Sequence, residues 1–451
     1  MKFNRREVKE EEKAAVIAYA EAHKELFSYP QPIKGTYDIA LGDEANHNFW
    51  YYKLWIKQME VAEKGSGLEE YFANQNLTME LPEGFSVKST VSMAAGSDIM
   101  AVDCICPDNT KHLFDDIKDF YFDADITTAN LESCIYDKAP YGRNQPEYKD
   151  APRMNSSEEM LDRIIDGGKG INYVSMANNH CYDYGIEGLM ASLDAVEKKG
   201  LLHSGTNRSK EEQEKALVVE KNGIQIAMLS CTADMNGHEY KEKYAINEVR
   251  LNDEEVDLSL IDKQLESAEE QGADITILHA HWGWEYELYP HTNIVSIAHT
   301  LAQKGIDVIV GTHPHCAEPS EVYEYEKDGE KKKCLIIYSL GDFVSFHPLT
   351  KDSKLTYIVK FNITKGELNG RTHTYVNDFK ILPLYILMAA DENNEYDCRL
   401  LKFKHVLEDK KDQNGNYKYS LTKEEREDVP RLKEILYNIL LPKNYENVKV
   451  D

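Results

Sequence analysis

Two histidines, His313 and His315, follow the apolar run of residues 308–310, with only Pro314 between them. In an extended segment, side chains two positions apart project to the same side, so we expect both imidazoles to face one point. Pro314 fixes its own backbone φ and stiffens that arrangement. Two neutral imidazoles on one side suit a divalent metal ion. We therefore predict that this segment forms one wall of a metal site.

The other predicted strands also end in residues that can ligate a metal. Their ends carry carboxylates, amides or imidazoles, among them Asp98, Asn130, Glu132, Asn178, Asn179, Asp183, His281, Glu285 and Asp342. Taken singly, each has a plainer explanation: Asp98 could be a turn residue and His281 a packed core histidine. Ligands gather at the carboxyl ends of strands, where loops bring distant residues together. In combination, these residues favour one shared site.

This mixture of nitrogen and oxygen donors suits one or two divalent ions, with Mn²⁺, Zn²⁺, iron and Mg²⁺ as the alternatives. Two ions about 3.5–4 Å apart clamp the attacking and leaving oxygens of a displacement at phosphorus, and they lower the pKa of a bridging water. His180 directly follows Asn179. It would therefore stand beside a metal-bound substrate as a general acid.

The elements that must position these residues begin at about residue 88, where short β-branched runs alternate with helical segments. The predicted strands are 89–96, 125–130, 171–178, 216–222, 224–231, 274–281, 306–312, 334–341 and 355–364. The predicted helices are 111–122, 157–167, 186–199, 253–271 and 292–304. Asn222-Gly223 signals a hairpin, so we expect mixed sheets in a layered α/β or α+β sandwich. We assign residues 1–87 and 391–451 to helical extensions and 88–390 to the central domain.

The charge of the chain restricts its partners. Lys and Arg total 52 against 79 Asp and Glu, which gives a net charge of −27. Nucleic-acid and anionic-membrane surfaces need clustered basic residues, so we exclude both classes of partner. The N-terminal sequence has no signal-peptide pattern, we expect no membrane anchor, and the eight cysteines lack zinc-type pairing. We therefore predict a cytoplasmic protein with reduced thiols.

In order along the chain, the motifs DIM, NLE, ANNHxxDxG, HWGxEY, GxHPH and YSLG resemble the CapA family of capsule and poly-γ-glutamate synthesis proteins. The resemblance covers roughly residues 88–390 and extends to the calcineurin-like metallophosphoesterase superfamily. It implies a four-layer sandwich of two mixed β-sheets flanked by helices. It also implies metal ligands at Asp98, Glu132, Asn179, His281, His313 and His315, with His180 assisting the leaving group. The same resemblance gives supporting roles to Asn130, Asn178, Asp183, Glu285 and Asp342.

The chain departs from the superfamily pattern near its first metal position. The usual Asp-x-His motif is here Asp98-Ile99-Met100, and a thioether is a poor ligand for a hard divalent ion. Asp342 stands where the family usually has Asn. These changes predict one tight metal site and one weak one.

Three functions remain open from the sequence. The first is a metal-dependent hydrolase acting on a phosphoester or related anionic substrate, small or polymeric. The second is a non-catalytic accessory protein of capsule or poly-γ-glutamate biosynthesis, and the third is a scaffold that keeps the fold but binds no metal. Fold alone does not separate them. Homo-oligomerisation is also left open.

Overall fold

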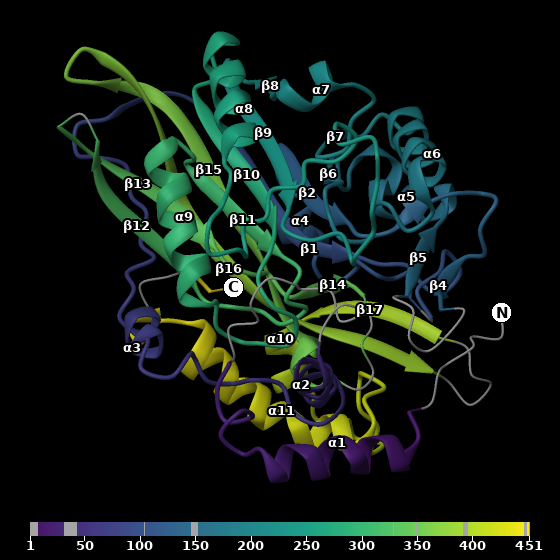
Figure 1. Ribbon diagram of the computed structural model, residues 1–451. Coiled ribbons are helices and arrows are strands. Elements are labelled where there is room, and N and C mark those ends of the chain that lie inside the picture. The colour runs from purple at the N-terminus through teal and green to yellow at the C-terminus, as the bar shows by residue number, and fades with distance from the viewer. Residues whose placement is uncertain are drawn as a thin grey trace.

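In the computed structural model, two mixed β-sheets pack face to face, with helices on the outer face of each (Figure 1). This is the predicted four-layer sandwich. The structure describes residues 8–30, 43–102, 104–145, 152–327, 329–345, 347, 350–390, 396–445 and 449–450. Parts of the two predicted helical extensions, residues 1–7, 31–42 and 391–395, therefore lie outside the described residues.

The larger sheet has nine strands among the described residues, in the order β17-β16-β15-β1-β2-β6-β7, with β14 beside β1 and β18 beside β16. The strands are β1 (Ser86–Ile99), β2 (Ile126–Leu131), β6 (Tyr173–Ser175), β7 (Leu202–Ser204), β14 (Asp342–Val344), β15 (Leu355–Leu368), β16 (Arg371–Ala390), β17 (Tyr396–Lys402) and β18 (Lys449–Val450). Strands β1, β2, β6 and β7 run parallel. Their carboxyl ends therefore lie at one edge.

The second sheet has six strands in the order β12-β13-β11-β10-β9-β8 within the described ranges. They are β8 (Leu217–Lys221), β9 (Ile224–Thr232), β10 (Ile275–His281), β11 (Val308–Thr312), β12 (Ser320–Lys327) and β13 (Glu330–Ile337). The predicted hairpin joins β8 to β9, and Asn222 and Gly223 both take positive φ there, 51° and 75°. A small third sheet consists of β3 (Cys134–Ile135), β4 (Gly142–Asn144) and β5 (Arg153–Ser156).

The core between the sheets follows from the two-residue period of a strand. Val91, Met93 and Ala95 of β1 face Ile275 and Ile277 of β10 in one apolar cluster. The alternate positions of the same strands pack outward, onto α5 and α6 on one side and α8 and α9 on the other. Both faces of each central strand are thus buried, which explains their nearly continuous apolar sequences.

The helices are α1 (Glu10–Ala22), α2 (Glu44–Trp55), α3 (Leu68–Ala73), α4 (Lys118–Tyr121), α5 (Glu158–Ile165), α6 (Gly185–Lys198), α7 (Lys210–Glu214), α8 (Ser259–Glu270), α9 (Thr292–Lys304), α10 (Phe403–Leu407) and α11 (Lys423–Ile435). Short helical turns η1 (Asp166–Gly168), η2 (Asp352–Lys354) and η3 (Leu436–Leu440) complete them. No helix among the described ranges is both long and apolar enough to span a membrane.

Several elements differ from the sequence-based expectation. The predicted helix 111–122 is mostly a run of turns, and only α4 is helical. The sequence analysis missed β12 and β16, and β17 lies in the segment that was expected to be helical. Strand β12 mixes polar and apolar residues because its second half is partly exposed, so it lacks a continuous apolar run. The second half of β16, residues 381–388, is a continuous buried apolar run that contains a proline, a residue that lowers the expectation of a strand.

The segment around α2 is fixed to the central sandwich by a buried ion pair. Lys53 Nζ donates to Glu287 Oε1 at 2.5 Å, and both side chains are almost fully buried. Glu287 also pairs with His291 at 2.7 Å. Beside this pair, the Met59 backbone bonds to Tyr286 and Leu288. The N-terminal segment is thus attached to the loop that follows β10.

We predict that Lys53→Met lowers the free energy of unfolding by about 3 kcal/mol, because it leaves a buried carboxylate without its ammonium partner. The matched control is Lys88→Met, since Lys88 pairs with Glu367 at the same 2.5 Å distance on the exposed surface. Such an exposed pair contributes less than about 1 kcal/mol. Urea denaturation measures both, and equal losses for the two variants would contradict the assignment.

Candidate metal centre

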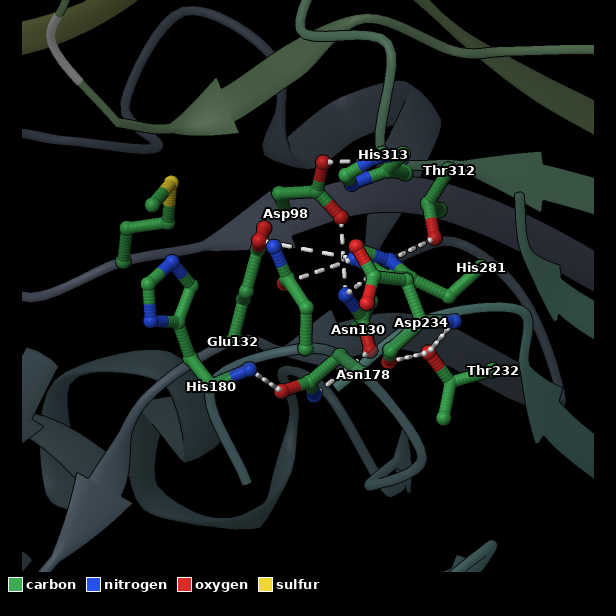
Figure 2. A network of polar contacts seen from close by, with 12 residues as sticks. Asp98, Asn130, Glu132, Asn178, His180, Thr232, Asp234, His281, Thr312 and His313 are labelled. Carbon is green, nitrogen blue, oxygen red and sulfur yellow. Dashed lines mark hydrogen bonds and ion pairs between the residues drawn. The ribbon is translucent and has the colours of Figure 1, made fainter. Parts of the chain in front are cut away.

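The carboxyl ends of strands from both sheets meet at one place. Asp98 ends β1, Asn130 lies near the end of β2, and His281 ends β10. These strands come from different sheets, yet Figure 2 shows the three side chains in one network. Glu132 follows β2 and His313 follows β11, and both side chains are buried there. The sandwich therefore brings together residues that are far apart in the sequence.

Asn130 and His281 connect the two sheets. Asn130 Nδ2 donates to Asp98 Oδ1 at 2.8 Å and lies 3.3 Å from His281 Nδ1. His281 Nδ1 is also 2.9 Å from Thr312 Oγ1, and His281 Nε2 is 3.0 Å from Asn179 Oδ1. If His281 binds a metal through Nε2, its ring proton must be on Nδ1. Thr312 Oγ1 can accept the hydrogen bond from that proton.

Glu132 has the surroundings that best suit a cation. Its side chain is fully buried, and neither carboxylate oxygen has a hydrogen-bond partner among the described residues. His281 Nε2 lies 3.5 Å away. Burial raises the pKa of Glu132. His313 Nδ1 is likewise buried and has no hydrogen-bond partner in the described ranges. Unpaired buried carboxylates are costly, and a bound cation would remove that cost, so these residues suit a metal ion.

Among the described residues, three groups of side chains have ligand atoms within 4.8 Å of one another, and every member except the partly exposed His347 is buried. The first group is Asp98, Glu132 and His315, the second is Glu132, His281 and His313, and the third is His315, Asp342 and His347. Glu132 belongs to both the first and the second group, as a bridging carboxylate would. Asn179 adjoins the second group through His281. The six ligand positions that the family resemblance implies thus lie in one connected cluster.

The His313–His315 segment differs in detail from the sequence-based expectation. It is not extended, because His313 and His315 have φ of 102° and 55°. Non-glycine residues rarely adopt such angles, and they cluster at functional sites when they do. The two rings still lie close, with centroids 6.1 Å apart, and the His313 ring is 4.7 Å from that of His281. The two imidazoles are close together, as expected, but the segment is not extended, so the reason given for their proximity is wrong.

His180 is held by a carboxylate three residues later. Its Nδ1 lies 2.8 Å from Asp183 Oδ2, which also accepts the Met154 amide at 2.6 Å. Burial lowers the pKa of His180, but the Asp183 charge and hydrogen bond outweigh it, so the net shift is upward. The His180 amide donates to Asn178 Oδ1 at 3.1 Å. His180 therefore keeps a fixed ring orientation, with Nε2 left for other contacts.

Glu285 and Asp342 each lie near one ring nitrogen of His315. His315 Nε2 is 3.7 Å from Glu285 Oε1, and His315 Nδ1 is 3.0 Å from Asp342 Oδ1. Burial lowers the pKa of His315, but the carboxylates of Asp342, Glu132 and Glu285 together raise it, and the pKa reaches about 10. Trp50 of α2 donates to the second oxygen of Glu285. The N-terminal segment thus contacts the centre directly.

Sequence reasoning missed three residues of this centre: Trp50, Asn236 and His347. Asn236 Oδ1 accepts from Asn179 Nδ2 at 3.1 Å, and Asn236 Nδ2 donates to the Asn179 carbonyl at 3.2 Å. This pair fixes the Asn179 amide so that its Oδ1 faces His281. The sequence signal for Asn236 is only an Asn-Gly turn, which gives no hint of a site.

His279, which the sequence placed beside His281, is not in the centre. Its ring packs on Tyr173 with centroids 5.0 Å apart, and burial lowers its pKa to about 3. His279 is two residues before His281 on β10, so both side chains point to the same face of the sheet. His279 lies farther from the end of the strand, where that face is covered by the core between the sheets. It is a neutral core histidine.

Comparison with known proteins gives the family. The model of the family described as bacterial capsule synthesis protein PGA_cap matches residues 84–347, more than half of the 451 residues. The chain belongs to this family. It is 27% identical to the PGA biosynthesis protein CapA of Bacillus subtilis over 68% of this chain and 73% of that protein. It is 24% identical to the capsule biosynthesis protein CapA of Bacillus anthracis, over 64% and 66% of the two chains. A probable polyglutamine synthesis accessory protein of Mycobacterium tuberculosis matches 38% of this chain and 44% of its own length at 27% identity.

Within this capsule synthesis family member, Met100 takes no part in the three groups. Its sulfur accepts a hydrogen bond from Ser345 Oγ at 3.3 Å, and its amide donates to the Val344 carbonyl at 2.9 Å. Met100 is thus a buried packing residue beside β14. The first group has His315 as its single imidazole, whereas the second has two.

We predict that Asn236→Gly weakens divalent-metal binding 10- to 100-fold, because residues that orient a ligand typically contribute that much. Glycine keeps the positive φ of 50° at this position without strain. The matched control is Asn222→Gly, at a hairpin turn with φ of 51°. Isothermal titration with Mn²⁺ or Zn²⁺ measures the affinities. Equal affinities for both variants and wild type would remove Asn236 from the centre.

Proposed function

We propose that this chain is a divalent-metal-dependent hydrolase that acts on a phosphoester or related anionic substrate. The observation that carries the proposal is the buried surplus of carboxylates around Glu132, whose oxygens have no hydrogen-bond partner within the described part of the chain. The residues that would hold one or two cations are Asp98, Glu132, Asn179, His281, His313 and His315. A bound divalent cation would supply a polarised phosphoryl oxygen and a water of lowered pKa.

His180 would supply the proton that the leaving group needs. Asp183 holds Nδ1 at 2.8 Å, so the proton available for transfer is on Nε2. The upward shift of the His180 pKa, in which the charge of Asp183 outweighs burial, favours the imidazolium that a general acid requires. Asn178 and Asp183 act through His180 and are positioning residues. The sequence and the packing thus support an acid beside the cation site.

The cluster also fits an anionic substrate better than the net charge of −27 suggests. Net charge acts over long range, whereas a bound cation and its imidazole ligands dominate the local field. The substrate could be small or polymeric, since the family name points to an anionic polymer. Charge alone does not distinguish a small anionic substrate from a polymeric one.

An accessory, non-catalytic role in capsule or poly-γ-glutamate synthesis is the second candidate. It is supported by the similarity to the Mycobacterium tuberculosis relative, which is named a probable polyglutamine synthesis accessory protein. In that role, the cation would stabilise a binding surface, and His180 would have no proton to transfer.

We expect the protein loaded with Mn²⁺ to hydrolyse generic phosphomonoesters or phosphodiesters, and His180→Ala to lower kcat by about 10²–10⁴-fold with its metal content unchanged. His313→Ala should instead lower the metal content, because it removes a ligand. His299→Ala is the control, since His299 pairs with Glu321 outside the centre. Steady-state kinetics and elemental analysis on the same samples provide both readouts.

Two results would decide against the hydrolase. If hydrolysis survives both His180→Ala and His313→Ala, it is not catalysed at this centre. A metal-loaded protein that is inactive on every ester tested, but co-purifies with components of polymer synthesis, supports the accessory role.

A further inference from the structure

We propose that Arg143 and Tyr286 form an anion-binding position beside the candidate metal centre, which holds a second carboxylate or phosphate group of the substrate. This inference rests on the metal-dependent hydrolase proposed above, and it narrows the substrates to molecules with an anionic group besides the phosphoester. Arg143 lies on β4 of the small sheet, and Tyr286 lies in the loop that follows β10. The two residues therefore come from separate parts of the fold.

Tyr286 packs against the imidazoles of the centre. Its ring is stacked on that of His315, with centroids 5.8 Å apart and planes at 29°, and it lies 5.9 Å from the ring of His347. The Tyr286 amide donates to the Pro314 carbonyl at 2.7 Å, and its φ is 63°. A positive φ is rare for a residue with a bulky side chain, and such residues cluster at functional sites. The ring is thus fixed at the edge of the centre.

The Tyr286 hydroxyl is a donor that a ligand could use. The residue is 3% exposed, and its hydroxyl has no hydrogen-bond partner within the described ranges. Burial raises the pKa of Tyr286 well above its usual value, and the charges of Glu285 and Asp342 raise it further. The hydroxyl therefore keeps its proton at neutral pH. An anionic oxygen from a ligand would give this donor the acceptor that the described residues do not supply.

Arg143 supplies the positive charge. Its side chain is exposed, and it forms no ion pair with any described residue. Arg143 is the register partner of Met154, whose amide donates to Asp183 Oδ2 at 2.6 Å. Burial raises the pKa of Tyr286 and the charge of Arg143 opposes that shift, so the guanidinium also lies near the hydroxyl. Arg143 is therefore close to the carboxylate that supports His180 and to the Tyr286 ring.

The strand that carries Arg143 is held in place by its next residue. Asn144 Nδ2 donates to the Gly142 carbonyl at 2.9 Å and to the Tyr184 hydroxyl at 3.0 Å. A planar guanidinium on such a fixed strand can bind a carboxylate or phosphate through two parallel hydrogen bonds. In a chain with a net charge of −27, this arginine also gives the rim of the centre a local positive charge.

The test compares aryl phosphates with and without a second anionic group, on the full chain loaded with Mn²⁺. Phenyl phosphate carries only the scissile group, and its ortho, meta and para carboxyl derivatives present a carboxylate at three distances from it. The variants are Arg143→Gln, Arg143→Lys and Tyr286→Phe. The matched control is Arg153→Gln on β5. Arg153 is also exposed and without an ion pair among the described residues, but its register partner is Asn144, so it points to the other face of the small sheet.

We expect wild type to have a lower KM for at least one carboxyl derivative than for phenyl phosphate. The ratio of kcat/KM for that derivative to kcat/KM for phenyl phosphate should fall roughly tenfold in Arg143→Gln, because a charge-assisted hydrogen bond is lost. Tyr286→Phe should lower the same ratio by a smaller factor. Arg143→Lys should recover part of it, since lysine keeps the charge without the planar fork. Arg153→Gln should keep the wild-type ratio.

The outcomes separate this inference from the hydrolase itself. If wild type hydrolyses all the compounds alike, or if Arg143→Gln keeps the wild-type ratio, the anion-binding position is wrong and the hydrolase stands. An equal fall in Arg153→Gln also overturns the position, because it reports a general loss of positive charge. If no compound is hydrolysed, the hydrolase fails, and calorimetric titration of the same compounds tests the position alone. Tighter binding of a carboxyl derivative to wild type than to Arg143→Gln supports it, and equal binding overturns it.

Discussion

The structure depends on one electrostatic constraint: carboxylates in and beside strands of the larger sheet are buried where they meet the strand ends of the second sheet, and among the described residues their basic partners are imidazoles. Removing charges from water is costly unless they are paired. Protonated histidines compensate in part, because burial lowers the pKa of His315 but the surrounding carboxylates together raise it above its usual value. Divalent cations would compensate fully. Every other feature of the centre, from the Asn130 bridge to the Asp183 support, positions groups around this excess of negative charge.

The sequence was sufficient for the sandwich and most of its strands, because central strands are buried on both faces and appear as β-branched runs. It was also sufficient to expect that the proposed ligand residues lie close together, since strand ends are where such folds collect functional groups. It was not sufficient for Asn236 and His347. Their place depends on the path of loops and on the pairing of β14 with β1, neither of which leaves a local pattern in the sequence.

The tandem histidines show a different limit. Their proximity follows from their spacing, but the left-handed φ of His313 and His315 does not. Backbone strain of this kind persists only when surrounding contacts enforce it, so it cannot be inferred from residue types. Here the His313 amide donates to Asp98 Oδ2 at 3.3 Å, which ties the strained segment to the opposite sheet. Similarly, Trp50 and Lys53 reach the loop after β10 from a helix that the sequence left without a clear partner.

The strand order of the larger sheet also has a consequence for biosynthesis. The carboxyl half of β1 pairs with β14 and β15, which come much later in the chain. At 5–20 residues per second, a ribosome needs roughly 12–50 s to add the residues between Asp98 and Asp342. During that interval, one side of β1 is an unpaired edge, the kind of surface that templates aggregation. Newly made chains would therefore depend on a chaperone, or on rapid release from the ribosome, to protect this edge, although β1 is paired on both sides in the finished sandwich.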